Sequence, residues 1–576
     1  MVQVVLDFFS RAFKRSRRPK TNSRRRSKNE PREFFSPVTQ FPSFEMTGSA
    51  PVVAGEEVAV DANLGARVVK GASWTVAGTI WTQMLGVART VVLARLLSQD
   101  DFGMAAMALT VSGAIYTLTN TGIVASVVSA RFDDEDELNS YVNLVWTLEL
   151  GRGVLIAMLI ALGAFPFSHF YGEPRLLPVL LVLALEPLFP INIGLLLQSR
   201  RVEMRRVTLN GLFANTLSVA ATLGLALWTR NYWALVWGQI VGSIASTIFS
   251  FVLSSYRPRL SWNAPLARRA FDFGKFQFVI GLCNYALGTM DNVLVGFFYG
   301  AKTLGVYAVA YSFCTMARSL VNNAFSTVLF PAFASAGRED DPTRLRSLVE
   351  RAFTLGVVVM TGVLVPLIAY APAIVRILFP KFGLAAVEPM RWLLIAGWFA
   401  GLLSLFSAFF VGLDRPRIES NSKLIDAGLF LVILLPLTRF YGVVGAAQAG
   451  AITWALATVW RWKWANALAP GALKRLPFLV VSAALVGGLA TYIGLVPWAL
   501  RSGLTRETWL QAFHPGLPAL GTAWLQLLLG GPCIAALCVL WLSGLHPVAR
   551  LELESLGGKL AARLGRRQKP HGQNPA

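Results

Sequence analysis

The chain has 576 residues, of which 55% are hydrophobic and only 15% are charged, and its mean hydropathy is +0.54. This apolar share exceeds what the core of a soluble protein requires, so the composition excludes an ordinary soluble domain and indicates a polytopic membrane protein. The formal net charge of +22 could suggest a nucleic-acid partner. Because the basic residues concentrate outside the apolar segments, we expect no nucleic-acid binding.

The N-terminal 70 residues are polar and basic, with the stretch RAFKRSRRPKTNSRRRSKNEPR at residues 11–32. We interpret residues 1–70 as a disordered cytoplasmic tail attracted to anionic lipid head groups, at about 1 kcal/mol per basic residue near the surface. The apolar stretch at the start is too short for a signal peptide and carries Asp7. Translation could instead begin at Met46, which starts an ordinary short leader.

Apolar runs of about 20 residues, the length that crosses a bilayer as a helix, recur from residue 72 to residue 543. The runs are apolar on all sides rather than alternating, which excludes a transmembrane β-barrel and predicts an all-α fold of about 14 helices. The expected parts are a tail (1–70), a first six-helix bundle (71–256), a cytoplasmic linker (257–272), a second six-helix bundle (273–466), two extra helices (467–543) and a cytoplasmic tail (544–576).

Charged residues inside the first predicted bundle are few, and each costs about 2.5–3.5 kcal/mol at mid-bilayer on insertion scales. They are Arg89, Glu149, Arg152 and Glu186. Glu149 and Arg152 stand at i, i+3 on one helical face, which predicts a structural ion pair. Glu186 lies beside Pro187 in a helix that proline should bend, so it is a candidate for ion coupling; the alternative is a neutral glutamate at a helix interface.

The second predicted bundle contains Asp291, Arg318 and Asp426. The stretch YSFCTMARSLVNNAF offers Arg318 no acidic residue, and a guanidinium donates to phosphate through a planar fork. Arg318 is therefore the leading candidate for binding an anionic ligand, with capping of a helix carbonyl as the alternative. Asn322, and Asn120 in the first bundle, are candidate substrate-binding amides, although single asparagines commonly join helices.

Residues 86–108 and 288–310 align without a gap at an offset of 202 residues, which matches Val91 with Val293 and Gly103 with Gly305. The same offset matches Arg89 with Asp291, and Asn120 with Asn322. Two repeats with an even number of helices share one orientation and usually enclose a central cavity. Arg89 and Asp291 then either pair across that cavity or act separately, as anion ligand and ion carrier.

Alternate loops are rich in lysine and arginine, and the positive-inside rule derives the orientation in the membrane from this pattern. One set of loops contains basic clusters such as Arg200 to Arg206 and Arg461 to Arg475, whereas the other holds single residues such as Arg175. Both termini are therefore predicted to be cytoplasmic.

No disulfide or metal site is expected, because the cysteines form no CxxC pair and have no histidine at ligand spacing. The four cysteines are Cys283, Cys314, Cys533 and Cys538.

The segment 71–123, with the pattern LARLLSQDDFG, resembles the opening of polysaccharide-transport proteins, the Wzx-type flippases of O-antigen and exopolysaccharide assembly. Their superfamily also includes the MATE drug exporters and the lipid II flippases. The resemblance implies a MATE-like fold and alternating-access translocation of an undecaprenyl-pyrophosphate-linked oligosaccharide across the bacterial inner membrane. It implies no catalytic chemistry and no cofactor. The implied driving force is a proton or sodium gradient, and the implied partners are polysaccharide polymerase and glycosyltransferases.

The resemblance also bears on two arginines. Arg89 stands where the lipid II flippases have a functional arginine, which implies a substrate-binding role for it. Arg318 matches only as a basic residue of the eighth helix. Since Arg89 is the only charged residue inside the first predicted helix, where the lipid II branch has more, lipid II is the less expected cargo.

Two other functions stay open. A MATE-type cation-coupled drug exporter shares the fold, but Arg89 and Arg318 disfavour it because such exporters hold cationic drugs with acidic residues. A membrane glycan polymerase or ligase needs acid–base residues in a sizeable outer loop. The longest outward segments predicted here, about 371–386 and 501–518, contain His514 as their only histidine.

Overall fold

The computed structural model describes residues 62–485 except 121, 125–126, 128–133, 201–203 and 339–341, and also residues 487–488. The chain divides into two compact units, Met1–Lys70 and Gly71–Ala576. The basic stretch 11–32, Met46, the last predicted helix, His514 and the last two cysteines lie outside the described residues. Helix α2 begins at Ala62, inside the predicted tail, because the helix-forming residues before Gly71 extend the helix beyond its apolar part.

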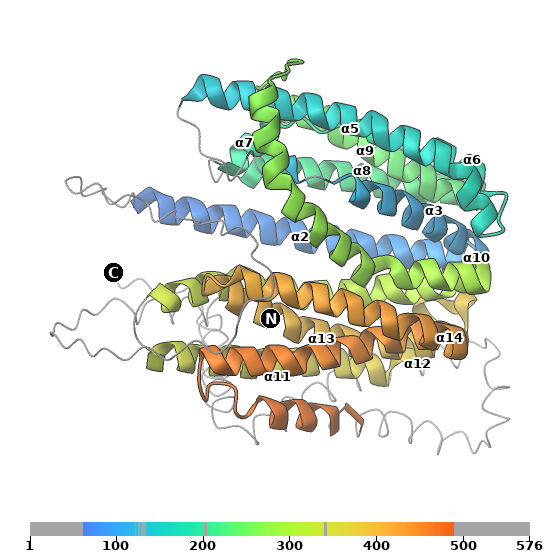
Figure 1. The fold of residues 1–576 in the computed structure, drawn as a ribbon. Helices are drawn as coiled ribbons and strands as arrows, with labels where there is room; N and C mark the ends of the chain where they lie inside the picture. Colours follow the sequence, from blue (N-terminus) through green and yellow to red (C-terminus); the bar gives the residue numbers. More distant parts are fainter. Residues whose placement is uncertain are drawn as a thin grey trace, which may run out of the picture. The chain divides into compact units, whose positions relative to one another are not determined.

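The described residues of the first half of the larger unit form helices joined by turns and loops, without strands (Figure 1). Its elements are α2 (Ala62–Leu96), α3 (Gln99–Leu118), α5 (Glu135–Phe170), α6 (Leu176–Leu183), the 3-10 turn η2 (Glu186–Leu188), α7 (Gly194–Arg200), α8 (Met204–Thr229) and α9 (Trp233–Leu253). The second half contains α10 (Ala264–Arg338), α11 (Pro342–Ala369), α12 (Ala371–Leu378), the turns η3 (Pro380–Phe382) and η4 (Leu384–Ala386), α13 (Val387–Gly412) and α14 (Pro416–Leu468). A short apolar helix, Leu476–Leu485, follows.

Eight helices among the described residues are long and apolar enough to cross a membrane. Helix α2, which carries Arg89 and Arg95, and the interrupted pair α6 and α7 are not among these eight. The predicted all-α membrane fold is confirmed for the described part of the chain. The number of about 14 helices stays a prediction, because the last of them lies beyond residue 488.

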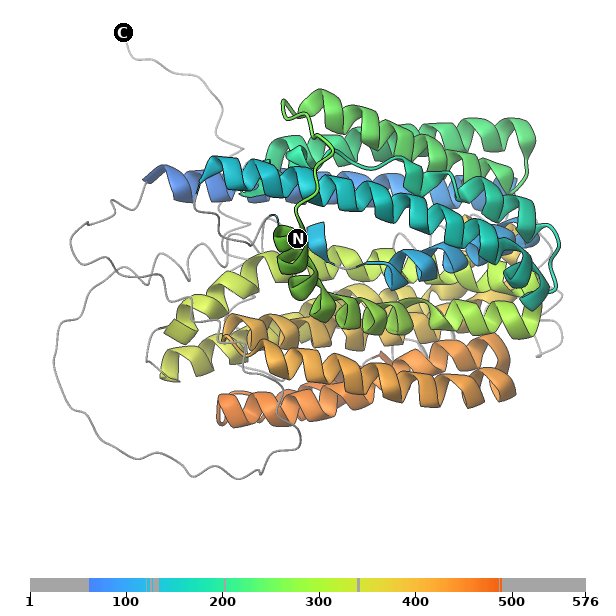
Figure 2. The same cartoon turned by 45° about the horizontal axis from the view of Figure 1, so that its top comes forward.

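Two of the eight helices bend back on themselves at a glycine. Gly300 in α10 has φ of +75° and Gly442 in α14 has φ of +64°, in the region that residues with a Cβ rarely adopt. Each glycine therefore separates a first leg from a second leg of its helix. The two orange legs of α14 run side by side in Figure 1 and Figure 2.

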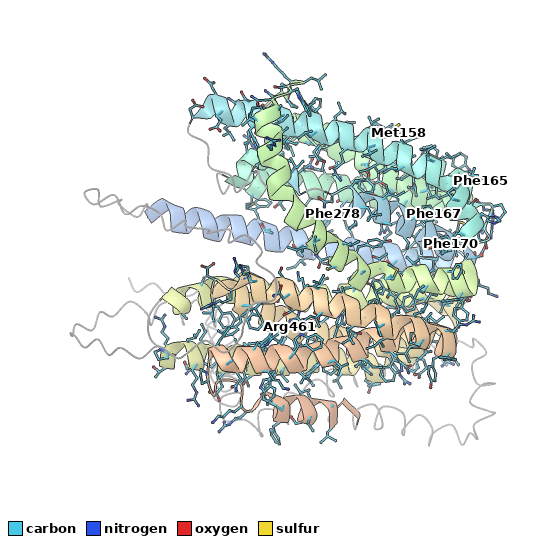
Figure 3. All side chains as sticks on the ribbon, in the orientation of Figure 1. Met158, Phe165, Phe167, Phe170, Phe278 and Arg461 are labelled. Atoms are coloured by element: carbon cyan, nitrogen blue, oxygen red, sulfur yellow. The ribbon has the colours of Figure 1, made fainter. Side chains whose placement is uncertain are left out.

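The fourth predicted helix is broken, as Pro187 led us to expect. Helix α6 ends at Leu183, η2 forms one 3-10 turn, and α7 starts only at Gly194. Proline cannot donate its backbone nitrogen to a helix, and the carbonyl oxygen of Pro187 instead lies directly against Gly153 of α5. The outer side of α5 exposes Met158 and Phe165 (Figure 3), as expected for a lipid-facing surface.

Two helix contacts through α10 organise the unit. The second leg of α10 packs in parallel along α13, with Cys314 Sγ 3.5 Å from the carbonyl oxygen of Met390 and the rings of Phe333 and Phe409 5.6 Å apart. The first leg packs on α3 of the first half, where the Tyr285 hydroxyl donates to the carbonyl oxygen of Thr110 (2.7 Å). Helix α10 thus joins the two halves.

Candidate functional site

Arg89 lies on α2 between a contact with the second half and a contact with the first. One turn before it, Gly86 lies opposite the sulfur of Met316 on α10. One turn after it, Leu93 packs with Ala226 in the first half. Arg89 is half-buried, and no hydrogen bond or ion pair joins it to another described residue. Its charge is therefore not neutralised within the described part of the protein.

Arg318 lies on the second leg of α10 and is also half-buried. Its stem packs beside Gly397 of α13. Its guanidinium carbon lies 5.6 Å from the ring centroid of Trp454, on the second leg of α14. No carboxylate pairs with Arg318 among the described residues, and this side of α10 faces α13 and α14. Arg89 and Arg318 thus occupy helices of the two halves that approach each other at Gly86 and Met316.

Asp291 is 5% exposed and lies on the first leg of α10. The hydroxyl of Tyr307, on the second leg, donates to its Oδ2 (2.6 Å), and the backbone N–H of Asn292 donates to its Oδ1 (2.9 Å). Arg89 and Asp291 do not pair in this structure, since none of the described lysines or arginines forms an ion pair with Asp291. The carboxyl group therefore ties the two legs of α10 together in a buried position.

Glu186 lies in the break of the fourth helix, within η2. Its Oε1 accepts hydrogen bonds from the Gln239 amide (2.9 Å) and the Ser243 hydroxyl (3.2 Å), both on α9. No lysine or arginine forms an ion pair with it in the described ranges. Asp291 and Glu186, the two carboxyls predicted for ion coupling, therefore lie in different halves, each hydrogen-bonded to neutral groups.

The ion pair between Glu149 and Arg152 is present. Arg152 Nη2 lies 2.7 Å from Glu149 Oε2, and Arg152 Nε donates to the same carboxylate at 3.1 Å. This contact forms within one turn of α5, as the i, i+3 spacing predicts. Both side chains are partly buried, so this arginine is neutralised locally and differs from Arg89 and Arg318 in that respect.

The two asparagines predicted for substrate binding lie in different environments. Asn120 is exposed in the turn after α3, where its Oδ1 accepts the backbone N–H of Gly122 (3.0 Å). Asn120 thus lies just beyond α3, which ends at Leu118. Asn322 lies within α10, and its Oδ1 accepts from the Ser404 hydroxyl of α13 at 3.3 Å.

A buried charge network in α14 was missed in the sequence. Arg461, assigned to a cytoplasmic loop, is 2% exposed and lies 2.6 Å from Asp426, which is 3% exposed. The carboxylate of Glu419 is 3.9 Å from Arg461 Nε. The pair joins the two legs of α14, and removing one partner of such a buried pair costs about 3–5 kcal/mol. Arg461 is therefore part of the helical core, as Figure 3 shows.

One end of the unit joins the two halves through several polar and aromatic contacts, and we call it the closed end. Arg95 donates to the carbonyl oxygen of Ile377 (2.8 Å), and Gln99 donates to that of Lys381 (2.7 Å). The ammonium of Lys381 returns a hydrogen bond to the carbonyl oxygen of Leu96 (2.9 Å). The closed end comprises residues 95–103, 170–175, 296–305 and 377–382.

The backbones of the two halves also meet at the closed end. A Cβ on Gly103 would collide with the carbonyl oxygen of Ala301, and a Cβ on Gly305 would collide with that of Gln99. Gln99 and Ala301 are equivalent at the same offset of 202 residues that matches the two glycines. The contact is therefore reciprocal, as in an interface across a two-fold axis. A pseudo-two-fold relation between the halves accounts for it.

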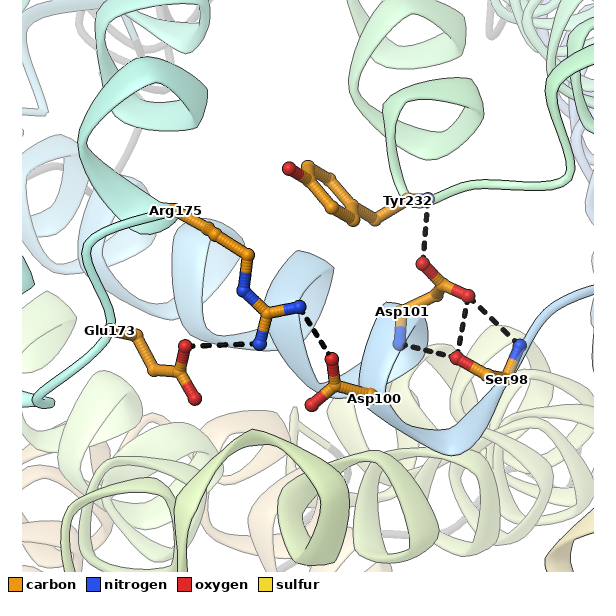
Figure 4. A network of polar contacts seen from close by, with 6 residues as sticks. All are labelled: Ser98, Asp100, Asp101, Glu173, Arg175 and Tyr232. Atoms are coloured by element: carbon orange, nitrogen blue, oxygen red, sulfur yellow. Dashed lines mark hydrogen bonds and ion pairs between the residues drawn. The ribbon is translucent and has the colours of Figure 1, made fainter.

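The motif LARLLSQDDFG fixes the first-half side of the closed end (Figure 4). Ser98 and Asp101 form a capping box at the start of α3, and Asp101 also accepts the backbone N–H of Tyr232 (3.1 Å). Arg175 bridges Asp100 (2.7 Å) and Glu173 (3.1 Å). Hydrogen bonds to Asp100 and then to Glu173 raise the pKa of Arg175 above its ordinary value. These acids therefore hold the neighbouring loops of the first half.

Comparisons with known proteins agree with this architecture. The model of a family described as "Polysaccharide biosynthesis protein" matches residues 92–384. The lipopolysaccharide biosynthesis protein WzxC of Escherichia coli K12 is 22% identical over 397 residues, which cover 68% of this chain and 77% of that protein. The succinoglycan biosynthesis transport protein ExoT of Rhizobium meliloti is 25% identical over 413 residues, covering 69% and 76%.

A solved structure of the lipid II flippase MurJ in an inward closed conformation is similar to this chain, with a TM-score of 0.60. The sequence identity is 15%, and the match covers 81% of this chain and 97% of that one. At this identity the similarity extends to the fold alone. The similarity agrees with the predicted all-α membrane fold.

Proposed function

Since the chain belongs to the polysaccharide biosynthesis protein family, we propose that it is a flippase for an undecaprenyl-pyrophosphate-linked oligosaccharide. The observation that carries this proposal is the pair of half-buried arginines, Arg89 and Arg318, neither of which has a carboxylate partner among the described residues. An unpaired cation inside a membrane domain is costly unless an anion or water meets it. A diphosphate head group supplies the matching charge, and a guanidinium binds it through several hydrogen bonds.

The proposed direction of transport is from the cytoplasmic to the periplasmic leaflet by alternating access. The closed end lies on the side that the positive-inside rule assigns to the periplasm, since the loops there are poor in basic residues. In our proposal this end seals the pathway while the substrate enters from the cytoplasm, and it then separates to release the substrate. Arg89 and Arg318 hold the pyrophosphate, with Asn322 as an additional hydrogen-bonding group. The glycosyltransferases that build the glycan supply this substrate, and a polymerase uses the product.

We assign ion coupling to Asp291, with Glu186 as a second candidate in the other half. A buried carboxylate without a cationic partner is costly, so Asp291 takes up a proton or a sodium ion when it is enclosed. The Asp291→Asn variant keeps the shape of the side chain and loses this exchange. We expect transport by this variant to become insensitive to an imposed proton or sodium gradient, measured in proteoliposomes.

The matched control for Asp291→Asn is Glu388→Gln, which removes a carboxylate that is half exposed and paired with Arg391. Its response to both gradients should equal that of the unaltered protein. An Asp291→Asn protein that still responds normally to both gradients would contradict the assignment of ion coupling to Asp291.

The direct test of the flippase uses the full chain reconstituted in liposomes with an undecaprenyl-pyrophosphate-linked oligosaccharide. Arrival of the glycan on the far leaflet is measured with a glycan-oxidising enzyme that cannot cross the membrane. We expect exposure of the glycan to depend on the protein and to leave the repeat unit unpolymerised. Efflux of a cationic dye without glycan exposure would favour a drug exporter, and elongation of the glycan would favour a polymerase.

A further inference from the structure

The guanidinium groups of the arginines in the described part of the protein meet partners of different kinds. Arg152, Arg175 and Arg461 each contact a carboxylate at 2.6–2.7 Å. Arg318 instead lies over an aromatic face, that of Trp454, at 5.6 Å from guanidinium carbon to ring centroid. The partner of Arg318 is therefore attractive to its charge but does not cancel it.

The position of Arg318 is determined from two sides. Its stem packs beside Gly397 of α13, in the parallel register that places Asn322 of α10 near Gly401 and Ser404 one turn further along. Its guanidinium extends to Trp454, which is half-buried on the second leg of α14. The long side chain of Arg318 has many rotamers, and the contact with the indole favours one of them. This contact leaves the N–H donors of Arg318 free to form hydrogen bonds.

An indole and a carboxylate hold a guanidinium in different ways. A carboxylate consumes N–H donors and neutralises the charge, as Glu149 does for Arg152. An indole face attracts the cation through the quadrupole of its π system and leaves the N–H donors unused. An arginine held in this way stays available to an oxyanion with several acceptor oxygens.

We propose that Trp454 is a positioning residue for Arg318, which holds the guanidinium in place so that its N–H donors bind the diphosphate group of the substrate. This proposal rests on the proposed function, and it names a residue outside those predicted from the sequence. Trp454 acts through the electron density of its ring rather than through its size.

The test replaces Trp454 in the full chain with tryptophans of increasing fluorine content, introduced at this codon alone. Fluorination withdraws electrons from the ring face and leaves its shape nearly unchanged, so a merely structural role would not respond. The readout is the affinity of the purified protein for inorganic pyrophosphate, used as the probe. We expect a stepwise loss that reaches about tenfold for the most fluorinated ring, in line with the strength of a cation–π contact.

Two further variants make the outcome decisive. Trp454→Leu should weaken pyrophosphate binding at least as much as full fluorination, while Trp464→Leu, a tryptophan on the same leg of α14, should leave the affinity unchanged. If Arg318→Ala loses affinity for pyrophosphate but the fluorinated tryptophans leave that affinity unchanged, the role of Trp454 is wrong and the proposed function stands. If Arg318→Ala binds pyrophosphate as well as the unaltered protein, the assignment of Arg318 in the proposed function is wrong.

Discussion

Replacing Arg318 by alanine is expected to reduce glycan translocation by about 10- to 100-fold. Hydrogen bonds to charged groups contribute about 1.5–3 kcal/mol each, and this variant removes the donors that we assign to the diphosphate. Arg318→Lys should retain part of the activity, because lysine keeps the charge but lacks the planar fork. The measurement is the initial rate of glycan exposure in the proteoliposomes described above.

Arg89→Ala should give a loss of similar size, since Arg89 is half-buried and also has no carboxylate partner among the described residues. The matched control is Arg439→Ala. Arg439 also lies over an aromatic ring, 5.6 Å from the centroid of Phe298, but it is exposed near the bend at Gly442. Normal rates for Arg318→Ala and Arg89→Ala together would remove the observation on which the flippase proposal depends. A loss of transport in the Arg439 variant as well would mean that removing any exposed charge reduces transport.

The sequence predicts those contacts that form within one helix or follow from hydropathy. The all-α membrane fold followed from apolar runs, and the Glu149–Arg152 pair followed from i, i+3 spacing, which places both side chains on one face. The break at Glu186 followed from Pro187, because proline interrupts the backbone hydrogen bonds of any helix. Each of these features is determined by residues that are close in sequence.

The features that sequence reasoning missed depend on contacts between helices. Arg461 was assigned to a loop because basic residues gather near helix ends, and its partner Asp426 lies 35 residues earlier on the other leg of α14. The signal available was Asp426 itself, since a carboxylate inside a predicted span requires a partner. Trp454 was missed because a single tryptophan inside an apolar helix has no sequence pattern that marks it as a partner of Arg318.

The repeat was visible in the sequence, but its physical meaning was not. Alignment matched Gly103 with Gly305, whereas the structure brings each glycine against the backbone of the other half. The same alignment matched Asn120 with Asn322, and there the halves differ, because α3 ends at Leu118 and α10 continues to Arg338. The structures of the two halves therefore correspond closely at the closed end, and this correspondence is lost towards the C-terminal end of α3.

Cross-linking the closed end is expected to stop transport, by at least 100-fold. Gln99 and Lys381 belong to different halves and are joined by a hydrogen bond of 2.7 Å, so cysteines at both positions can be bridged by a short cleavable bis-thiosulfonate reagent. If the halves must separate there to release the glycan, a covalent bridge holds the protein in one state. Cleavage with a reductant should restore the rate, which distinguishes a trapped protein from a damaged one.

The control variants carry one of the two cysteines each and receive the same reagent, in a background where Cys283, Cys314, Cys533 and Cys538 are replaced by serine. Their rates should stay within about twofold of the untreated protein, because surface substitutions outside the core have small effects. Full activity of the bridged protein would show that the substrate leaves without separation of the closed end. In that case alternating access at this end would be wrong, while the assignment of the two arginines would remain to be judged by their own variants.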